Sequence, residues 1–109
     1  MFSSGVVLFM FHVKESRIHG KGLFAQIKIN EGTVIDFLEG RRTNENGPYV
    51  LWIDDDYGFE VHNEVKYVNH SPQPNAAYYD DLTLVALRDI EPGEEITHHY
   101  GEMWEEGEK

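Results

Sequence analysis

Side chains that can form hydrogen bonds are concentrated in one short stretch, Lys66 to Ala76 (KYVNHSPQPNA). It places Asn69 and His70 before a rigid Pro-Gln-Pro and a second asparagine, Asn75. Amide and imidazole groups in such a stretch could bind a polar small molecule or could stabilise a tight turn. The stretch alone does not decide between these two interpretations.

Two further segments contain residues that could contact a ligand. In Ser16 to Ala25 (SRIHGKGLFA), Gly20 and Gly22 permit positive φ and a close approach of the backbone to a ligand. A Gly-x-Gly by itself is more typical of an ordinary turn. The other segment, Asp89 to Gly101 (DIEPGEEITHHYG), ends in a tyrosine and a glycine, which adds a phenolic hydroxyl to the potentially reactive groups.

Short strands are expected to position these segments. The acidic turns Asp54 to Asp56 and Asp80 to Asp81 each separate two strand-like runs, which predicts two hairpins. Helix signals are weak, and the best is a short turn with Asn63 as its N-cap. The predicted strands are Val6 to Val13, Thr33 to Phe37, Tyr49 to Ile53, Tyr57 to Val61, Ala76 to Tyr79, Leu82 to Leu87 and Ile96 to Tyr100.

Composition limits the class of protein. A chain of 109 residues is expected to form one domain, and the absence of cysteine excludes disulfides and thiolate zinc sites. The formal net charge of −11 argues against binding to nucleic acid and favours a basic partner. The apolar run Val6 to Phe11 is too short to cross a bilayer and does not have the pattern of a signal peptide, so we expect a soluble intracellular protein.

In their order and spacing, the three segments resemble the SET domain family of protein-lysine methyltransferases. Ser16 to Ala25 is similar to the family's Gly-x-Gly-Leu-Phe-Ala motif, and Asn69 to Asn75 to its Asn-His-Ser-x-x-Pro-Asn motif. Ala86 to Gly101 is similar to its closing segment, which ends in Tyr-Gly. The match runs from about residue 13 to residue 101, which predicts a single SET-like domain over residues 1–109 with a short acidic tail at 102–109.

The resemblance implies a fold and a reaction. The fold is mostly β, a SET-type β-clip of small curved sheets with a C-terminal pseudoknot and few short helical turns. The reaction is methyl transfer from S-adenosylmethionine to the ε-amine of a lysine in a basic protein or peptide such as a histone, with no metal. A neutral amine at pH 7 costs roughly 4–5 kcal/mol for a free lysine, and desolvation in an aromatic channel lowers that cost.

The roles of individual residues follow from the same resemblance. Tyr100 is the expected catalytic residue, because its hydroxyl would orient the amine and the methyl group. Asn75 is expected to tie its loop together, whereas Tyr67 and Phe24 are expected to pack in the core. The expected cofactor-binding residues are Gly20, Lys21, Gly22, Asn69 and His70, and the expected residues of the substrate channel are Tyr78, Leu38 and Trp104.

The sequence departs from the family pattern in ways that leave details open. Leu38 occupies a segment in which many members have a tyrosine just before a glycine, which leaves the number of methyl groups transferred undetermined. Without cysteines there is no zinc module to close the channel, so Met103 and Trp104 or a partner subunit would close it. The chain resembles the short SET proteins of bacteria and viruses, which suggests bacterial cytoplasm or, for a viral protein, the host cell or nucleus.

Other interpretations remain open on sequence alone. One is a SET-like module that binds a basic peptide without catalysing transfer. Another is a metal protein, although His98 and His99 are adjacent and would point to opposite faces of a strand. A domain without a channel-closing module could also form a homodimer that buries Val6 to Phe11. No membrane association is expected.

Overall fold

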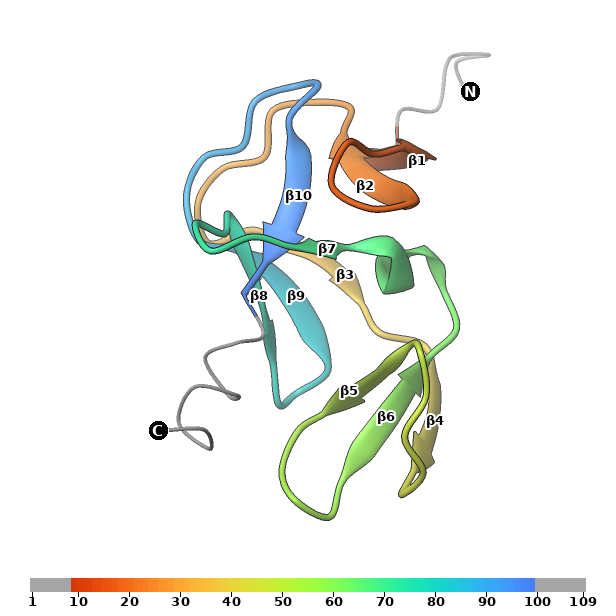
Figure 1. The fold of residues 1–109 in the computed structure, drawn as a ribbon. Helices are drawn as coiled ribbons and strands as arrows, with labels where there is room; N and C mark the ends of the chain where they lie inside the picture. The colour runs from red at the N-terminus through yellow and green to blue at the C-terminus, as the bar shows by residue number, and fades with distance from the viewer. Residues whose placement is uncertain (1–8, 100–109) are drawn as a thin grey trace, which may run out of the picture.

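Short strands form nearly all of the regular structure in residues 9–99, which are the residues described in this computed structural model of the protein (Figure 1). Within that range the helical structure consists of one 3₁₀ turn, η1 (Glu64–Tyr67). The prediction of a mostly β fold built from small separate sheets is therefore confirmed. No helix of the described residues is long and apolar enough to span a membrane.

Three small sheets are formed by the described residues. The first has the strand order β1 (Phe11–Glu15), β2 (Lys21–Ala25), β10 (Glu95–His98) and β7 (Asn69–His70). The second has the order β3 (Val34–Phe37), β9 (Thr83–Ala86) and β8 (Ala76–Tyr79). The third has the order β4 (Gly40–Thr43), β6 (Gly58–Val61) and β5 (Val50–Trp52).

Both predicted hairpins are confirmed. β5 pairs antiparallel with β6 across the Asp54–Asp56 turn, and β8 pairs antiparallel with β9. Leu82, at φ 66, takes the left-handed conformation that closes the second turn. Three strands were not predicted, namely β2, β4 and β7. The predicted strand Val6 to Val13 begins at Phe11 in the described residues, and its first three positions lie outside them.

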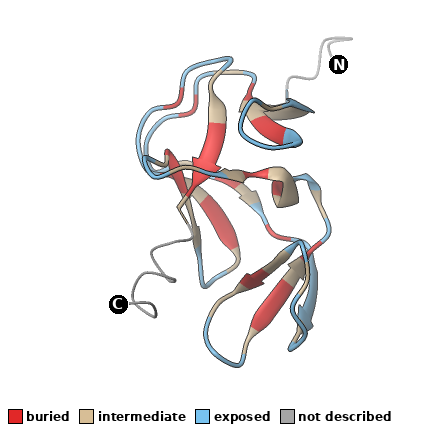
Figure 2. Cartoon of the chain, viewed as in Figure 1, coloured by how far each residue is buried: buried red, intermediate tan, exposed pale blue. Residues whose placement is uncertain are grey.

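The core is formed by buried residues from all three sheets, and Figure 2 shows these residues in red on the strands. Leu23 of β2 and Ile96 of β10 are fully buried and lie opposite each other in the register of the first sheet. Leu84 of β9 contributes from the second sheet. Burial of each such side chain contributes about 1.5–3 kcal/mol, so the core holds β10 against its neighbours.

Two asparagines connect segments that are distant in sequence. Buried Asn75 fastens β10: its Nδ2 donates to the Glu95 carbonyl at 2.8 Å, and its Oδ1 accepts from the Thr97 amide at 2.8 Å. Asn63 is the N-cap residue of η1, as predicted, but its side chain makes no capping hydrogen bond. Its side chain instead accepts from the Glu39 amide at 3.0 Å and donates to the Phe37 carbonyl at 2.9 Å, which ties η1 to the end of β3.

The Asn-His stretch and the last strand lie side by side. β7 and β10 pair in parallel, with Thr97 opposite Asn69 and His98 opposite His70. The parallel arrangement brings together segments that start 26 residues apart, as the resemblance implied. The expected pseudoknot also involves residues 100–109, which lie outside the described residues.

Candidate functional site

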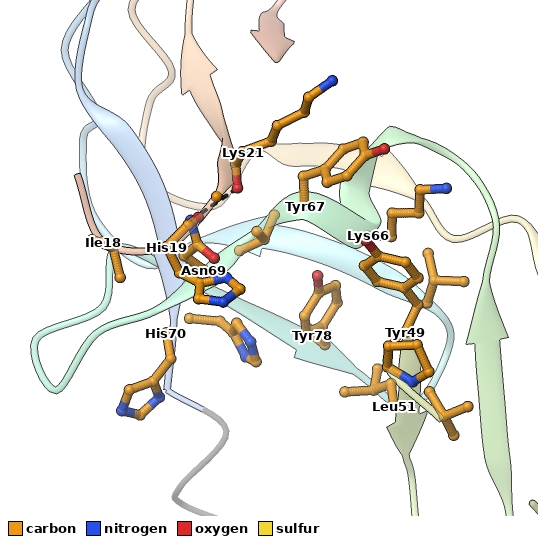
Figure 3. A pocket seen from close by; sticks show the side chains of 16 residues that line it. Ile18, His19, Lys21, Tyr49, Leu51, Lys66, Tyr67, Asn69, His70 and Tyr78 are labelled. Carbon is orange, nitrogen blue, oxygen red and sulfur yellow. Dashed lines mark hydrogen bonds between the residues drawn. The ribbon is translucent and has the colours of Figure 1, made fainter. Parts of the chain in front are cut away.

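A cavity of about 720 Å³ lies where the Gly20–Lys21 turn, β7 and the start of β5 meet (Figure 3). Its volume is in the range of sites that bind small molecules. One wall comes from the turn before β2 and from β7, and the facing wall comes from β5 and the residues just before it. The lining residues are Ile18, His19, Gly20, Lys21, Pro48, Tyr49, Val50, Leu51, Val61, Lys66, Tyr67, Val68, Asn69, His70, Tyr78 and His98.

The glycine turn is shaped by local hydrogen bonds. The Ser16 amide donates to the Gly20 carbonyl at 2.8 Å, and the Ser16 hydroxyl accepts from the Ile18 amide at 2.8 Å. Gly20 has φ 45, a left-handed conformation that glycine adopts without the steric cost of a side chain. The turn therefore brings backbone groups to the edge of the cavity.

Asn69 holds this turn against the last strand. Its Nδ2 lies 3.0 Å from the His19 carbonyl, 3.1 Å from the Lys21 carbonyl and 2.9 Å from Glu95 Oε2. The other oxygen of that carboxylate, Glu95 Oε1, accepts from the Ser16 hydroxyl at 2.9 Å. The Glu95 carboxylate thus bridges the two motifs, a contact that the sequence analysis missed.

Gly22 leaves space for that bridge. A Cβ at Gly22 would collide with Glu95 Oε2 and would lie 3.0 Å from the Ser16 Cβ. Gly22 is not among the residues that line the cavity. Gly22 therefore acts by leaving room for the Glu95 carboxylate, which joins Ser16 to Asn69.

The charge of the cavity is opposite to that of the chain. Of the described residues, no aspartate or glutamate lines it, whereas Lys21 and Lys66 both do, although the chain contains 20 acidic residues. No carboxylate in residues 9–99 forms an ion pair with either lysine, although Glu15 lies opposite Lys21 in the first sheet and Glu64 lies near Lys66. Two lysines at a cavity whose described lining holds no carboxylate favour a ligand that carries an anionic group.

Aromatic residues form the opposite wall. Tyr49 and Tyr67 pack edge to face with their ring centroids 6.0 Å apart. The Lys66 ammonium lies 5.0 Å from the Tyr49 ring and 5.2 Å from the Tyr67 ring, close enough for cation–π attraction. Tyr67, which was expected to pack in the core, therefore also faces the cavity. No sequence pattern pointed to Tyr49, because it lies singly at the end of a loop.

Two uncharged side chains lie deeper in the cavity. The Tyr78 hydroxyl donates to the Val65 carbonyl at 2.8 Å, and burial raises the pKa of Tyr78. The His98 ring meets the Tyr78 ring edge to face at 4.9 Å. Burial, reinforced by the nearby charges of His70 and His99, lowers the pKa of His98 to about 4. Both groups are therefore neutral near pH 7.

Five of the predicted site residues come together on this cavity: Gly20, Lys21, Asn69, His70 and Tyr78. Leu38 lies elsewhere, because its side chain is buried in the core and does not line the cavity. Tyr100 and Trp104 lie outside the described residues. Within residues 9–99, no cluster of three or more histidine, aspartate or glutamate side chains is arranged to hold a metal ion.

Comparison with protein families gives a match over most of the chain. The model of the SET domain matches residues 20–101, a range that contains the glycine turn, the Asn-His stretch and β10. The chain belongs to the SET domain family. Members of this family are in general protein-lysine methyltransferases. Comparison with curated protein sequences gives no significant match.

A solved structure shows the same SET fold. The crystal structure of a candidate histone methyltransferase from Plasmodium falciparum superposes with a TM-score of 0.71. The alignment covers 90% of this chain and 98% of that one, with 19% sequence identity. At this identity the similarity establishes the fold of the SET domain, and the residues of the cavity must be interpreted from their own chemistry.

Proposed function

We propose that the protein is a protein-lysine N-methyltransferase that binds S-adenosylmethionine in the cavity beside Asn69 and acts on a basic protein or peptide. The observation that carries this proposal is the cavity in which Gly20, Lys21, Asn69 and His70 meet, and whose described lining contains no aspartate or glutamate. Family membership supplies the reaction class, and the chemistry of the cavity supports the cofactor.

The residues present fit such a cofactor. S-adenosylmethionine, when bound, supplies a methyl group on a positively charged sulfur. Lys21 and Lys66 would bind its carboxylate, and the rings of Tyr49 and Tyr67 offer apolar surface for its flat adenine. The carbonyls of His19 and Lys21 lie at the edge of the same cavity, where they could accept hydrogen bonds from its ammonium group.

The other residues of the site would fix the backbone around the cofactor, keep positive charge away from its sulfonium and orient the lysine amine. Asn69 would act by fixing the His19–Lys21 backbone, because its amide already donates to both carbonyls. Neutral Tyr78 and His98 add no positive charge that would repel a sulfonium. We assign Tyr100 the role of orienting the lysine amine, from its place in the closing motif.

Titration calorimetry of the full chain tests the cofactor. S-adenosylmethionine and its demethylated product should both bind at a ratio of one to one. A radiolabelled methyl donor should then label lysine in basic peptides and leave matched peptides with arginine in place of lysine unlabelled. If neither compound binds by calorimetry or raises the melting temperature, the enzyme assignment is wrong and a peptide-binding module becomes the better interpretation.

A further inference from the structure

One face of the β3–β9–β8 sheet presents apolar side chains to solvent. Phe37 and Tyr79 both lie opposite Thr83 in the register, and one step along the sheet Val34 and Ala77 both lie opposite Val85. Paired residues share a face of an antiparallel sheet, and so do residues two apart on one strand. We refer to this face as the outer patch, which consists of Val34, Phe37, Ala77, Tyr79, Thr83 and Val85.

The outer patch is unusual because the sheet already buries its other face. Leu84 and Ala86 of β9 point into the core and are 0% and 2% exposed. The second face of such a sheet normally carries polar side chains. Here Phe37 is 62% exposed, Tyr79 46% and Val34 42%. Thr83, which lies between Phe37 and Tyr79, is only 6% exposed, so the exposed apolar groups of the patch are the side chains on either side of it. Exposed large apolar side chains grouped in this way are typical of a protein interaction site.

Carboxylates border the outer patch at the β8–β9 turn. The Thr83 hydroxyl donates to Asp81 Oδ1 at 2.6 Å, which places that carboxylate beside the row formed by Phe37, Thr83 and Tyr79. Asp80 is exposed in the same turn. Among the described residues, no lysine or arginine forms an ion pair with either aspartate. A cationic side chain seated here would meet both carboxylates and aromatic rings.

We propose that the outer patch docks a basic segment of the protein substrate that also carries apolar side chains. This inference rests on the proposed function and adds where the substrate protein would be held. Two chains of net charge −11 repel each other, so charge complementarity favours a basic partner over a second copy. Tyr78 and Tyr79 are neighbours on β8, with Tyr78 lining the cavity and Tyr79 on the outer patch, so one strand connects the two sites.

Binding of a labelled peptide tests the proposal on the full chain. The probe is a short fluorescent peptide that alternates lysine and leucine, and a peptide that alternates lysine and serine has the same charge without the apolar groups. The Phe37→Ser/Tyr79→Ser variant should bind the first peptide about tenfold more weakly or worse, because two apolar contacts are lost. Phe9→Ser is the matched control, since Phe9 is 66% exposed and lies outside this sheet, and it should bind as the wild type does.

A charge variant keeps the test valid if the serine variant does not fold. Asp80→Lys changes an exposed turn residue and should weaken binding of the lysine–leucine peptide and reduce its dependence on salt. Unchanged affinity in both variants would overturn the proposal. So would sedimentation showing that the wild type dimerises and that Phe37→Ser/Tyr79→Ser is monomeric, because a second copy would then cover the patch.

Calorimetry with S-adenosylmethionine on the same samples separates the docking proposal from the proposed enzyme function. Peptide binding at the patch without cofactor binding supports docking and rejects the enzyme assignment.

Discussion

The side-chain amide of Asn69 lies 2.9 Å from the carboxylate of Glu95, across a separation of 26 residues. The same amide holds the His19 and Lys21 carbonyls, and the same carboxylate holds the Ser16 hydroxyl. This pair therefore connects the glycine turn, β7 and β10, the three segments that form one side of the cavity.

Replacing both members of the pair should show that they act together. Asn69→Ala and Glu95→Ala should each lower the free energy of unfolding by about 1–3 kcal/mol, because each leaves a partly buried polar partner unsatisfied. The double variant should lose less than the sum, with a coupling of about 0.5–3 kcal/mol in a double-mutant cycle. Urea unfolding measures the stability and calorimetry measures cofactor affinity, which Asn69→Ala should also reduce. Strict additivity would show that the two side chains do not cooperate.

Gly22→Ala should displace the Glu95 carboxylate, because the new methyl group would occupy its position. The cost is the loss of the two carboxylate hydrogen bonds, about 1–3 kcal/mol in the free energy of unfolding, together with weaker cofactor binding. Gly47→Ala is the control, since a Cβ there meets only the Val50 Cγ2 at 3.5 Å. Equal effects of the two substitutions in urea unfolding would contradict this explanation of Gly22.

Lys66→Met and Lys21→Met should each raise the Kd for S-adenosylmethionine by about tenfold, or about 1.4 kcal/mol, through loss of an ammonium partner for its carboxylate. Binding of 5′-methylthioadenosine, which has no carboxylate, should change little. Lys28→Met is the matched control, because Lys28 pairs with Asp89 at 3.7 Å and does not line the cavity. Equal weakening for both ligands in calorimetry would mean that the lysines act through packing instead.

His98 should make the protein sensitive to mild acid. The folded pKa of His98, about 4, lies below the ordinary histidine pKa of 6.5, so the unfolded chain binds this proton more readily. The stability that neutral His98 provides is complete above pH 6.5 and is lost progressively as the pH falls from 6.5 to about 4. Between pH 7 and pH 5 the loss should be about 2 kcal/mol. Urea unfolding should show a shallower acid dependence in His98→Gln than in the wild type, and an unchanged slope in this variant would contradict the assignment.

Tyr100→Phe should reduce methyl transfer at least tenfold, about 1.4 kcal/mol in activation free energy, with little change in cofactor affinity. Only the hydroxyl that orients the amine is removed. Tyr57→Phe, outside the cavity lining, gives a matched loss of a hydroxyl and should keep full turnover. A Tyr100→Phe enzyme with wild-type turnover in the radiolabel assay would remove this residue from catalysis.

The hairpins could be predicted from sequence because their signals are local. Acidic turns separate the paired runs of β5 with β6 and β8 with β9, and both pairs form as expected. β2 was missed because Gly22 weakens the strand signal. It is nevertheless a strand, since β1 and β10 pair with its two edges. β1 is close in sequence, but β10 comes from the other end of the chain, so its pairing cannot be inferred from the residues around β2.

The candidate site likewise contains some residues that could be predicted from sequence and others that could not. Asn69 and His70 could be selected because the motif that contains them is short and specific. Glu95 could not, since its partner Ser16 lies 79 residues away and an acidic residue in an acidic chain carries no distinguishing signal. Tyr49 likewise reaches the cavity through the placement of the third sheet, which depends on packing between sheets.

The parallel pairing of β7 with β10 has a consequence for how the protein forms. Pairings between segments distant in sequence are slow to nucleate, because a long loop must close before any contact compensates for its entropy. A chain still emerging from the ribosome would hold the glycine turn and Asn69 long before β10 is synthesised, and would have no complete cavity. Cofactor binding should therefore appear only as β10 docks, so that binding of the cofactor reports completion of this part of the fold.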